Sequence, residues 1–510
     1  MQPHKVYRIY ISIIILIMVT GCSGITPITP PTSTVKIPTQ VTQVATEIPV
    51  TLTPATPNAE AEPGAPGLGD SLYPNFGNGG YDVQHYTLDL TVHNVATSDL
   101  DGITTIEAKA TQNLSSFNLD FIGFEITNIT VNGQPADFER NGQELTITPS
   151  TLLTENESFT TEVQYQGSPG VMNSIALPFQ TGWVTFNGGS FVLSEPDGSA
   201  SYYPVNDHPL DKASYTFRVS VPKPFEVAAN GILTDSIDNG ETTTFVFEER
   251  APMASYLATV DIDEFDMETS QSQNGIPIRN YYSTGLPEEF RKPFERQGDM
   301  LTYFSDIFGP YPFEVYGALV MDTNFGAALE NQTMSIFGMD MVHPEEVETT
   351  ELTIAHELSH QWFGDSVSVA DWRDIWLNES FATYAEGLWI EHTKGRAALD
   401  NWMKELYRFV LQNREHFSSP GEPPADDLFN GGVYFWGALC LHSLRLEVGD
   451  KAFFEILKTY YERYKGGNAT TQDFISVAEE ISGKTLKTFF DSWLYSKEIP
   501  PIPSLGLEAK

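Results

Sequence analysis

Two histidines and two glutamates occur in this chain at spacings that suit a metal ion. His356 and His360 flank Glu357 in the run His-Glu-Leu-Ser-His, and Glu379 follows nineteen residues after the second histidine. Residues four apart share one face of a helix, so both imidazoles can reach a single ion, and imidazole is a good ligand for zinc. Glu357, one position round the helix, can flank the ion as a general base without binding it.

Glu379 indicates what kind of zinc site this would be. It lies in a second helical run, residues 376–384, which Gly364 and Asp365 separate from the first helix. If the two helices pack together, Glu379 supplies a third ligand, and the fourth position stays open for water. An open position is typical of catalytic zinc. The alternative, an amphipathic helix with two histidines in ordinary hydrogen bonds, is disfavoured by this nearby glutamate.

Three further motifs stand in order around the zinc motif. Residues 326–331 read Gly-Ala-Ala-Leu-Glu-Asn, residues 434–437 read Tyr-Phe-Trp-Gly, and a loop between Glu195 and Ala213 begins with Glu-Pro and ends with Lys-Ala. With the zinc motif they resemble the M1 family of zinc aminopeptidases, in its exopeptidase motif, its catalytic-tyrosine segment and its N-terminal-domain signature. The resemblance covers almost all of the chain from about residue 70 to residue 500.

The resemblance implies a role for each residue that would carry the chemistry. His356, His360 and Glu379 would bind one zinc ion per chain. Glu357 would be the general base, and Tyr434 would donate a hydrogen bond to the oxyanion of the transition state. Zinc would lower the pKa of its water from 15.7 toward ~7 and polarise the scissile carbonyl.

The same resemblance implies how the substrate would be held. Glu330 would bind the free α-amine of a peptide, assisted by Glu195, so that an endopeptidase site becomes an exopeptidase site. Ala327, Ala328 and Asn331 would complete the substrate-binding segment. The chain departs from the family pattern here, because Ala327 aligns with the usual glycine of the motif and the following methionine is replaced by a leucine.

Two other functions remain open at this point. A thermolysin-like zinc endopeptidase would use the same zinc chemistry on internal bonds. A non-catalytic peptide-binding lipoprotein could retain the fold without activity. The complete set of ligands and base favours the aminopeptidase over both. Tyr384 and Glu386, near the zinc helix, could support the metal ligands, but packing or solvation is the favoured role for both.

The N-terminus has the features of an export signal. Basic residues precede an apolar run over residues 9–19, which is too short to span a membrane and ends in Val-Thr-Gly-Cys22. This resembles the lipobox of bacterial lipoproteins, so residues 1–22 would be a lipoprotein signal peptide with Cys22 as the lipidation site. Residues 23–69, rich in threonine and proline, would form a disordered linker. We therefore expect an extracytoplasmic protein, lipid-anchored to a bacterial membrane.

The rest of the chain predicts an α+β multidomain protein. Alternating apolar residues at 86–92, 126–131, 159–165 and 215–221, separated by Asn-Gly turns, predict an antiparallel β-sandwich-like domain over residues 70–264. Residues 265–510 would form a thermolysin-like, mainly helical zinc-peptidase domain, without the large C-terminal helical domain of many M1 members. The net charge of −40, from 28 basic and 68 acidic residues, excludes nucleic acid as a partner.

Overall fold

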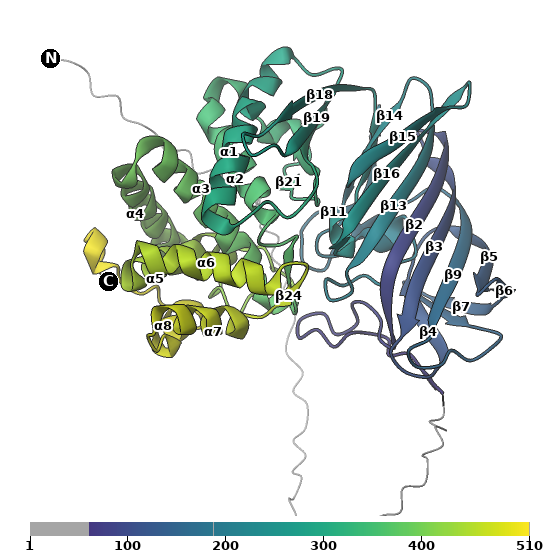
Figure 1. Cartoon of the computed structure of the whole chain (residues 1–510), viewed down its shortest axis with the longest axis horizontal. Coiled ribbons are helices and arrows are strands. Elements are labelled where there is room, and N and C mark those ends of the chain that lie inside the picture. Colours follow the sequence, from purple (N-terminus) through teal and green to yellow (C-terminus); the bar gives the residue numbers. More distant parts are fainter. Residues whose placement is uncertain (1–60, 187, 509–510) are drawn as a thin grey trace, which may run out of the picture.

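The computed structural model describes residues 61–186 and 188–508, and it consists of a β-rich part beside a helical part (Figure 1). The predicted signal peptide, Cys22 and the linker up to residue 60 lie outside these residues. Within the described chain, no helix is long and apolar enough to cross a membrane. One continuous hydrophobic core runs through both parts, so the helical part is packed onto the β-rich part rather than tethered to it.

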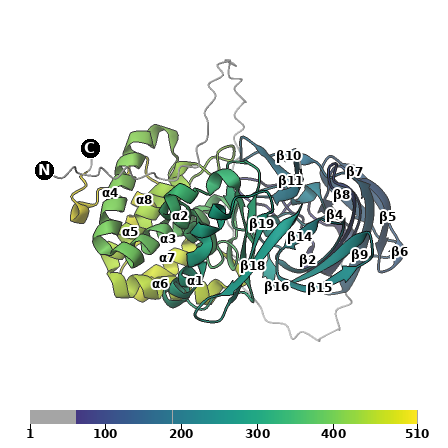
Figure 2. The same ribbon diagram turned by 90° about the horizontal axis from the view of Figure 1, so that it is seen from above.

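The β-rich part is organised around a curved eight-stranded sheet (Figure 2). Apolar and polar residues alternate along its strands, and the apolar face is buried, as in β3. The predicted strands fall within this sheet, although β2 and β13 pair in parallel while the other neighbours are antiparallel. In order across the sheet the strands are β15 (Ile232–Asp238), β16 (Thr242–Met253), β13 (Ala213–Pro222), β2 (Tyr81–Asn94), β3 (Asp99–Ala110), β9 (Ser158–Gly167), β5 (Glu125–Val131) and β6 (Gln134–Pro135).

Two smaller sheets complete this part of the molecule. One carries β1 (Glu62–Pro63), β4 (Leu114–Asp120), β8 (Glu144–Thr148) and β7 (Asp137–Asn141). The other carries β10 (Val171–Asn173), β11 (Gln180–Phe186), β12 (Gly189–Leu193), β17 (Val260–Asp263) and β14 (Glu226–Ala229). Strand β12 ends two residues before Glu195, so this second sheet places the Glu-Pro loop.

The prediction of a linker reaching residue 69 is wrong for its last residues. Glu62 and Pro63 pair in parallel with β4, and the Gly64 amide donates to the Ser116 carbonyl at 2.9 Å. A side chain at position 64 would lie 2.5 Å from the Gly79 carbonyl oxygen. Glycine therefore lets this segment approach the β-rich part closely. Its composition does not predict this docking, because Leu68 is its only large apolar residue.

The helical part begins with a five-stranded sheet and continues as helices. The sheet carries β18 (Phe265–Gln271), β19 (Pro277–Ser283), β20 (Tyr316–Met321), β22 (Ser335–Gly338) and, at its edge, β21 (Ala328–Leu329). The predicted boundary at residues 264 and 265 lies between β17 and β18. The α-helices are α1 (Gln297–Phe308), α2 (Val347–His360), α3 (Trp376–Lys394), α4 (Arg396–Asn413), α5 (Gly437–Val448), α6 (Asp450–Tyr464), α7 (Thr471–Ser482) and α8 (Lys487–Leu494). Two short strands, β23 (Val367–Val369) and β24 (Gly467–Ala469), pair with each other in parallel.

Polar contacts fasten the two parts together around the segment that follows α2. Lys212, at the end of the Glu-Pro loop region, is partly buried, and its ammonium donates to the carbonyls of Asp365 at 2.7 Å and Ser366 at 3.1 Å. Asn230 donates to the Gln332 carbonyl at 2.7 Å. These bonds tie backbone carbonyls of the helical part to the β-rich part, and they fix the chain before and after α2.

Candidate metal and substrate site

Helices α2 and α3 bring the three predicted metal ligands together. His356 and His360 lie one turn apart at the end of α2, and Glu379 lies in the first turn of α3. The Nε2 atom of His356 is 3.3 Å from Glu379 Oε2, and the Nε2 atom of His360 is 3.6 Å from the same oxygen. All three side chains are largely buried, so one carboxylate oxygen faces two imidazole nitrogens in a confined space.

The other ring nitrogen of each histidine is held by a hydrogen-bond acceptor. His356 Nδ1 donates to Glu386 Oε1 at 2.9 Å, and His360 Nδ1 donates to the Phe363 carbonyl at 3.1 Å. A neutral imidazole that donates from Nδ1 has its lone pair on Nε2, which is the atom that faces Glu379. Such partners are typical of metal-binding histidines, and the donor set fits zinc.

Glu386 supports a candidate metal ligand, which was the less favoured of the two roles that the sequence suggested for it. Packing or solvation was preferred, but its carboxylate fixes the ring orientation of His356. Its position contained a usable signal, because Glu386 is seven residues after Glu379. That spacing is about two helical turns, so both carboxylates project from one face of α3 toward α2.

Burial and neighbouring charges divide the glutamates of the site into two groups. Burial alone would raise the pKa of Glu379, but His360 and His356 lower it to about 2. Burial raises the pKa of Glu357 to about 8, against the opposing effect of the two histidines. Three atoms lie within 4.8 Å of one another: one carboxylate oxygen of Glu357, one of Glu330 and one ring nitrogen of His360. Glu357 therefore lies beside the metal ligands as a carboxylate with raised proton affinity.

Tyr434 reaches the site from a π-helical turn, Gly432–Trp436, that leads into α5. Its ring stacks on His356, with 6.0 Å between ring centroids and 20° between ring planes. Burial, together with the negative charges of Glu379 and Glu195, raises the pKa of Tyr434 well above its usual value. The phenol thus stays protonated and is a hydrogen-bond donor next to the metal ligands.

Glu195 and Glu330 come together from different parts of the chain. Oxygens of Glu195, Glu330 and Glu379 lie within 4.8 Å of one another. Among the described residues, neither Glu195 Oε1 nor Glu330 Oε1 has a hydrogen-bond partner, although both atoms are buried. Burial raises the pKa of both carboxyls, and Glu330 raises that of Glu195 further. An uncompensated acidic pair of this kind is suited to a cationic ligand group.

The residues on either side of Glu330 lie partly in a cleft and partly in the protein interior. Ala327 and Ala328 line a cleft that also contains Glu195 and Tyr434. Asn331 is fully buried, and its amide donates to the Leu257 carbonyl in the β-rich part at 3.1 Å. The side-chain amide of Asn331 therefore anchors the segment to the β-rich part, and its contact with substrate stays a prediction.

The cleft beside the two glutamates is mainly apolar. Its walls come from the β10–β11 connection of the β-rich part, from β12, from the β21 segment and from the loop before α5. Its apolar side chains are those of Leu177, Phe179, Leu193, Leu329 and Phe429, and Asp427 is the remaining carboxylate besides Glu195. A group that enters this cleft next to Glu195 would be surrounded by hydrocarbon on most sides.

Comparisons with known sequences and structures agree with this geometry. A family model described as the peptidase M1 N-terminal domain matches residues 82–257, and one described as the peptidase family M1 domain matches residues 293–493. The structure of an M1 zinc metallopeptidase from Deinococcus radiodurans superposes with a TM-score of 0.78 and 33% identity, covering 86% of this chain and 99% of that one. A variant of that enzyme with the same coverage has been solved with a Tyr-Ser-Ala substrate.

A curated relative extends well beyond the matched region. Aminopeptidase N of Streptomyces lividans is 29% identical over 309 residues, which are 56% of this chain and 36% of that protein. The chain thus matches only about a third of the length of this relative, whereas it matches the Deinococcus structure from end to end.

The contact between Glu386 and His356 generates a test of the metal site. Replacing Glu386 with glutamine removes the charge that orients His356, and loss of such a partner typically weakens metal binding about 10- to 100-fold. Competition with a chromophoric chelator should show this loss of zinc affinity. The matched control is Glu348→Gln on α2, because Glu348 is exposed and contacts Lys394. Equal zinc affinity in wild type and Glu386→Gln would contradict the role of Glu386.

Proposed function

Because this chain belongs to peptidase family M1, we propose that it is a zinc-dependent aminopeptidase that releases the N-terminal residue from peptides. The observation that carries the proposal is the convergence of two buried glutamates, Glu195 and Glu330, with the site formed by His356, His360 and Glu379; each of the two has one carboxylate oxygen without a partner among the described residues. A metal site alone supports hydrolysis. The adjacent acidic pair supports recognition of a free N-terminus.

The three ligands would hold a zinc ion with an open coordination position. When bound, zinc acts as a Lewis acid toward the scissile carbonyl and makes water a stronger acid. The contacts of His356 with Glu386 and of His360 with the Phe363 carbonyl keep both Nε2 atoms directed to the ligand position. The protein thus contributes a preorganised set of ligands before substrate arrives.

Glu357 and Tyr434 would carry the proton transfer and the stabilisation of negative charge. Glu357 accepts the proton of the attacking water and delivers it to the leaving amine, an effect typically worth about 10²–10⁴-fold in rate. Tyr434 donates its phenol proton in a hydrogen bond to the oxygen that becomes negative in the transition state. Removal of such a donor costs roughly 2.7–4 kcal/mol of activation free energy.

The α-ammonium of the substrate would bind between Glu330 and Glu195. A single positive charge placed there offsets the repulsion between two buried carboxylates, which have no other partner for the oxygens named above. Strand β21 is at the edge of its sheet, so its outer backbone groups are available to an extended peptide. The ammonium would fix the register of that peptide, so that its first bond meets Glu357.

The apolar cleft favours peptides whose N-terminal residue has a particular kind of side chain. The first side chain of a peptide held by Glu195 and Glu330 would enter the cleft lined by Leu193, Leu329 and Phe429. Burial of a large apolar side chain is favourable by about 1.5–3 kcal/mol, whereas an acidic side chain would face Asp427 and Glu195. We propose peptides with a large apolar N-terminal residue as the preferred substrates.

The proposed location is extracytoplasmic, with the protein lipid-anchored to a bacterial membrane. The signal-like residues 1–22 and the lipobox-like sequence before Cys22 support a lipid anchor, and the Thr/Pro-rich segment after it would separate the enzyme from the lipid surface. Peptides outside the cytoplasm would then be the accessible substrates.

Loss of the general base should abolish most of the activity. Glu357→Gln preserves shape but cannot accept a proton, so kcat for aminoacyl anilides should fall by about 10²–10⁴-fold. Zinc content by metal analysis should remain near one per chain, since Glu357 is not a ligand. Hydrolysis at the wild-type rate by this variant would refute the mechanism.

Free and N-acetylated versions of one peptide should distinguish an aminopeptidase from an endopeptidase. The wild-type enzyme should cleave the free peptide and ignore the acetylated one, because the acetylated nitrogen carries no charge for Glu330. Glu330→Gln should lose most of its kcat/KM for the free peptide; the exposed Glu314→Gln serves as control. Efficient cleavage of the blocked peptide would instead support a thermolysin-like endopeptidase.

The substrate class can be tested with a series of anilides that differ in one side chain. Leucine and phenylalanine substrates should exceed the aspartate substrate by at least about tenfold in kcat/KM. Phe429→Ala should reduce the value for leucine more than for alanine, because it removes one wall of the cleft. Phe138→Ala, an exposed phenylalanine of β7, is the control. A preference for aspartate would overturn this assignment.

A further inference from the structure

The turn that carries Tyr434 has an irregular backbone hydrogen-bond pattern. In an α-helix the Val433 carbonyl would accept from the Gly437 amide, four residues on. Here the Gly437 amide donates to the carbonyls of Gly432 and Tyr434 instead. The π-helical turn therefore diverts the donor that the Val433 carbonyl would have in an α-helix, and this residue is completely buried.

Ser380 supplies a donor to that carbonyl from the neighbouring helix. Its hydroxyl donates to the Val433 carbonyl at 2.5 Å, and both residues are fully buried. Ser380 directly follows Glu379, and Val433 directly precedes Tyr434. One hydrogen bond thus links the first turn of α3, which carries Glu379, with the π-helical turn, which carries Tyr434.

Gly437 allows the two backbones to approach closely enough for this bond. A Cβ atom added at position 437 would lie 1.7 Å from Ser380 Oγ. No side chain fits at that position beside the serine hydroxyl, so the spacing of α3 and the π-helical turn is set by one hydroxyl and one glycine. The Tyr-x-x-Gly pattern of the sequence thus has a packing reason as well as a catalytic one.

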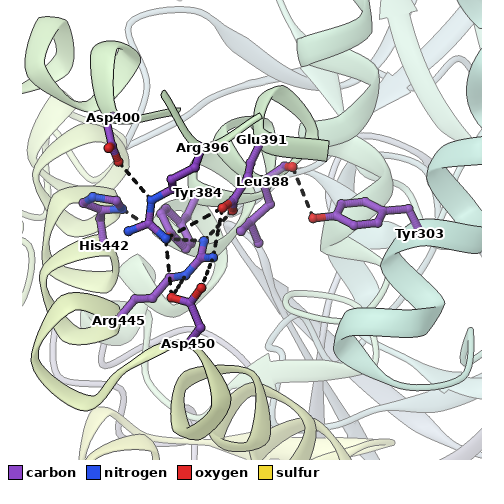
Figure 3. Close-up of polar contacts among 9 residues, drawn as sticks. All are labelled: Tyr303, Tyr384, Leu388, Glu391, Arg396, Asp400, His442, Arg445 and Asp450. Atoms are coloured by element: carbon purple, nitrogen blue, oxygen red, sulfur yellow. Dashed lines mark hydrogen bonds and ion pairs between the residues drawn. The ribbon is translucent and has the colours of Figure 1, made fainter. Parts of the chain in front are cut away.

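The opposite end of α3 is attached to α5 by a separate contact. The Arg445 guanidinium lies between Glu391 and Asp450, with its Nη1 atom 2.6 Å from Glu391 Oε2 and its Nε atom 2.9 Å from Asp450 Oδ1 (Figure 3). Glu391 is twelve residues after Glu379, about 18 Å along the helix. This ion-pair cluster can hold the helices together but cannot by itself set the position of Tyr434.

We propose that Ser380 is a positioning residue that holds the Tyr434 phenol at a fixed distance from the metal ligands. The proposal rests on the proposed function, because Tyr434 acts there as a donor in the transition state. Without the hydroxyl, the π-helical turn loses its link to α3, and the phenol is no longer held in place for the developing oxyanion. An effect confined to the transition state lowers kcat and leaves KM nearly unchanged.

The test compares Ser380→Ala with a matched control on the same helix. Ser380→Ala should lower kcat for a leucine anilide by roughly tenfold, about the loss expected for one buried hydrogen bond. KM and zinc content should stay within about twofold of wild type. The control is Thr393→Val, because the Thr393 hydroxyl also donates to a backbone carbonyl, that of Trp389 at 2.9 Å, but at the far end of α3. It should retain wild-type kcat.

A double variant separates positioning of Tyr434 from a general loss of structure. Ser380→Ala in a Tyr434→Phe background should lower kcat no further than Tyr434→Phe alone, because the group that Ser380 positions is already absent. Equal fractional losses in both backgrounds would overturn the proposal. So would a wild-type kcat in Ser380→Ala.

Amide hydrogen exchange provides a readout that does not depend on activity. Residues 432–437 should exchange faster in Ser380→Ala than in wild type, while residues 347–360 of α2 should be unchanged. Unchanged exchange in both segments would contradict the link between Ser380 and the turn. Failure of the aminopeptidase function itself would be seen separately, as a wild-type protein that does not hydrolyse free aminoacyl substrates.

Discussion

The site depends on a group of carboxylates that are buried together without enough positive charge. Glu195, Glu330 and Glu357 all have pKa values raised by burial, and only Glu379, which faces two imidazoles, has a lowered one. Such a group is unfavourable unless cations enter it. A metal ion and a substrate ammonium are the two cations that the geometry admits. Under the proposed function, binding of these cations relieves an electrostatic cost that folding creates.

The surrounding structure keeps these carboxylates in place despite their repulsion. The candidate metal ligands lie on two packed helices. Glu386 and the Phe363 carbonyl accept hydrogen bonds from the Nδ1 atoms of the two imidazoles. The segment that carries Glu330 is fastened to the β-rich part through Asn331, with Asn230 bonding the next residue. Each acidic group is thus supported by contacts outside the cluster, which is what a preorganised site requires.

Features governed by short-range spacing could be predicted from the sequence. The histidines four residues apart share a face of α2, and the alternating runs became strands of the large sheet. Features that depend on residues far apart in the chain could not be predicted from the sequence. The parallel pairing of β2 with β13, the docking of residues 62–69 and the π-helical turn at Tyr434 have no local sequence pattern. Support of His356 by Glu386 was the less favoured interpretation, although the helical spacing of Glu386 from Glu379 was available.

The origin of Glu195 in the β-rich part has a consequence for how selectivity could change. All three candidate metal ligands belong to α2 and α3, whereas the proposed amine site is divided between the β-rich part and the β21 segment. A small rotation at the junction would separate Glu195 from Glu330 while the candidate metal ligands kept their geometry. Under the proposed function, substitutions along that junction would therefore relax the selection of a free N-terminus without disabling hydrolysis.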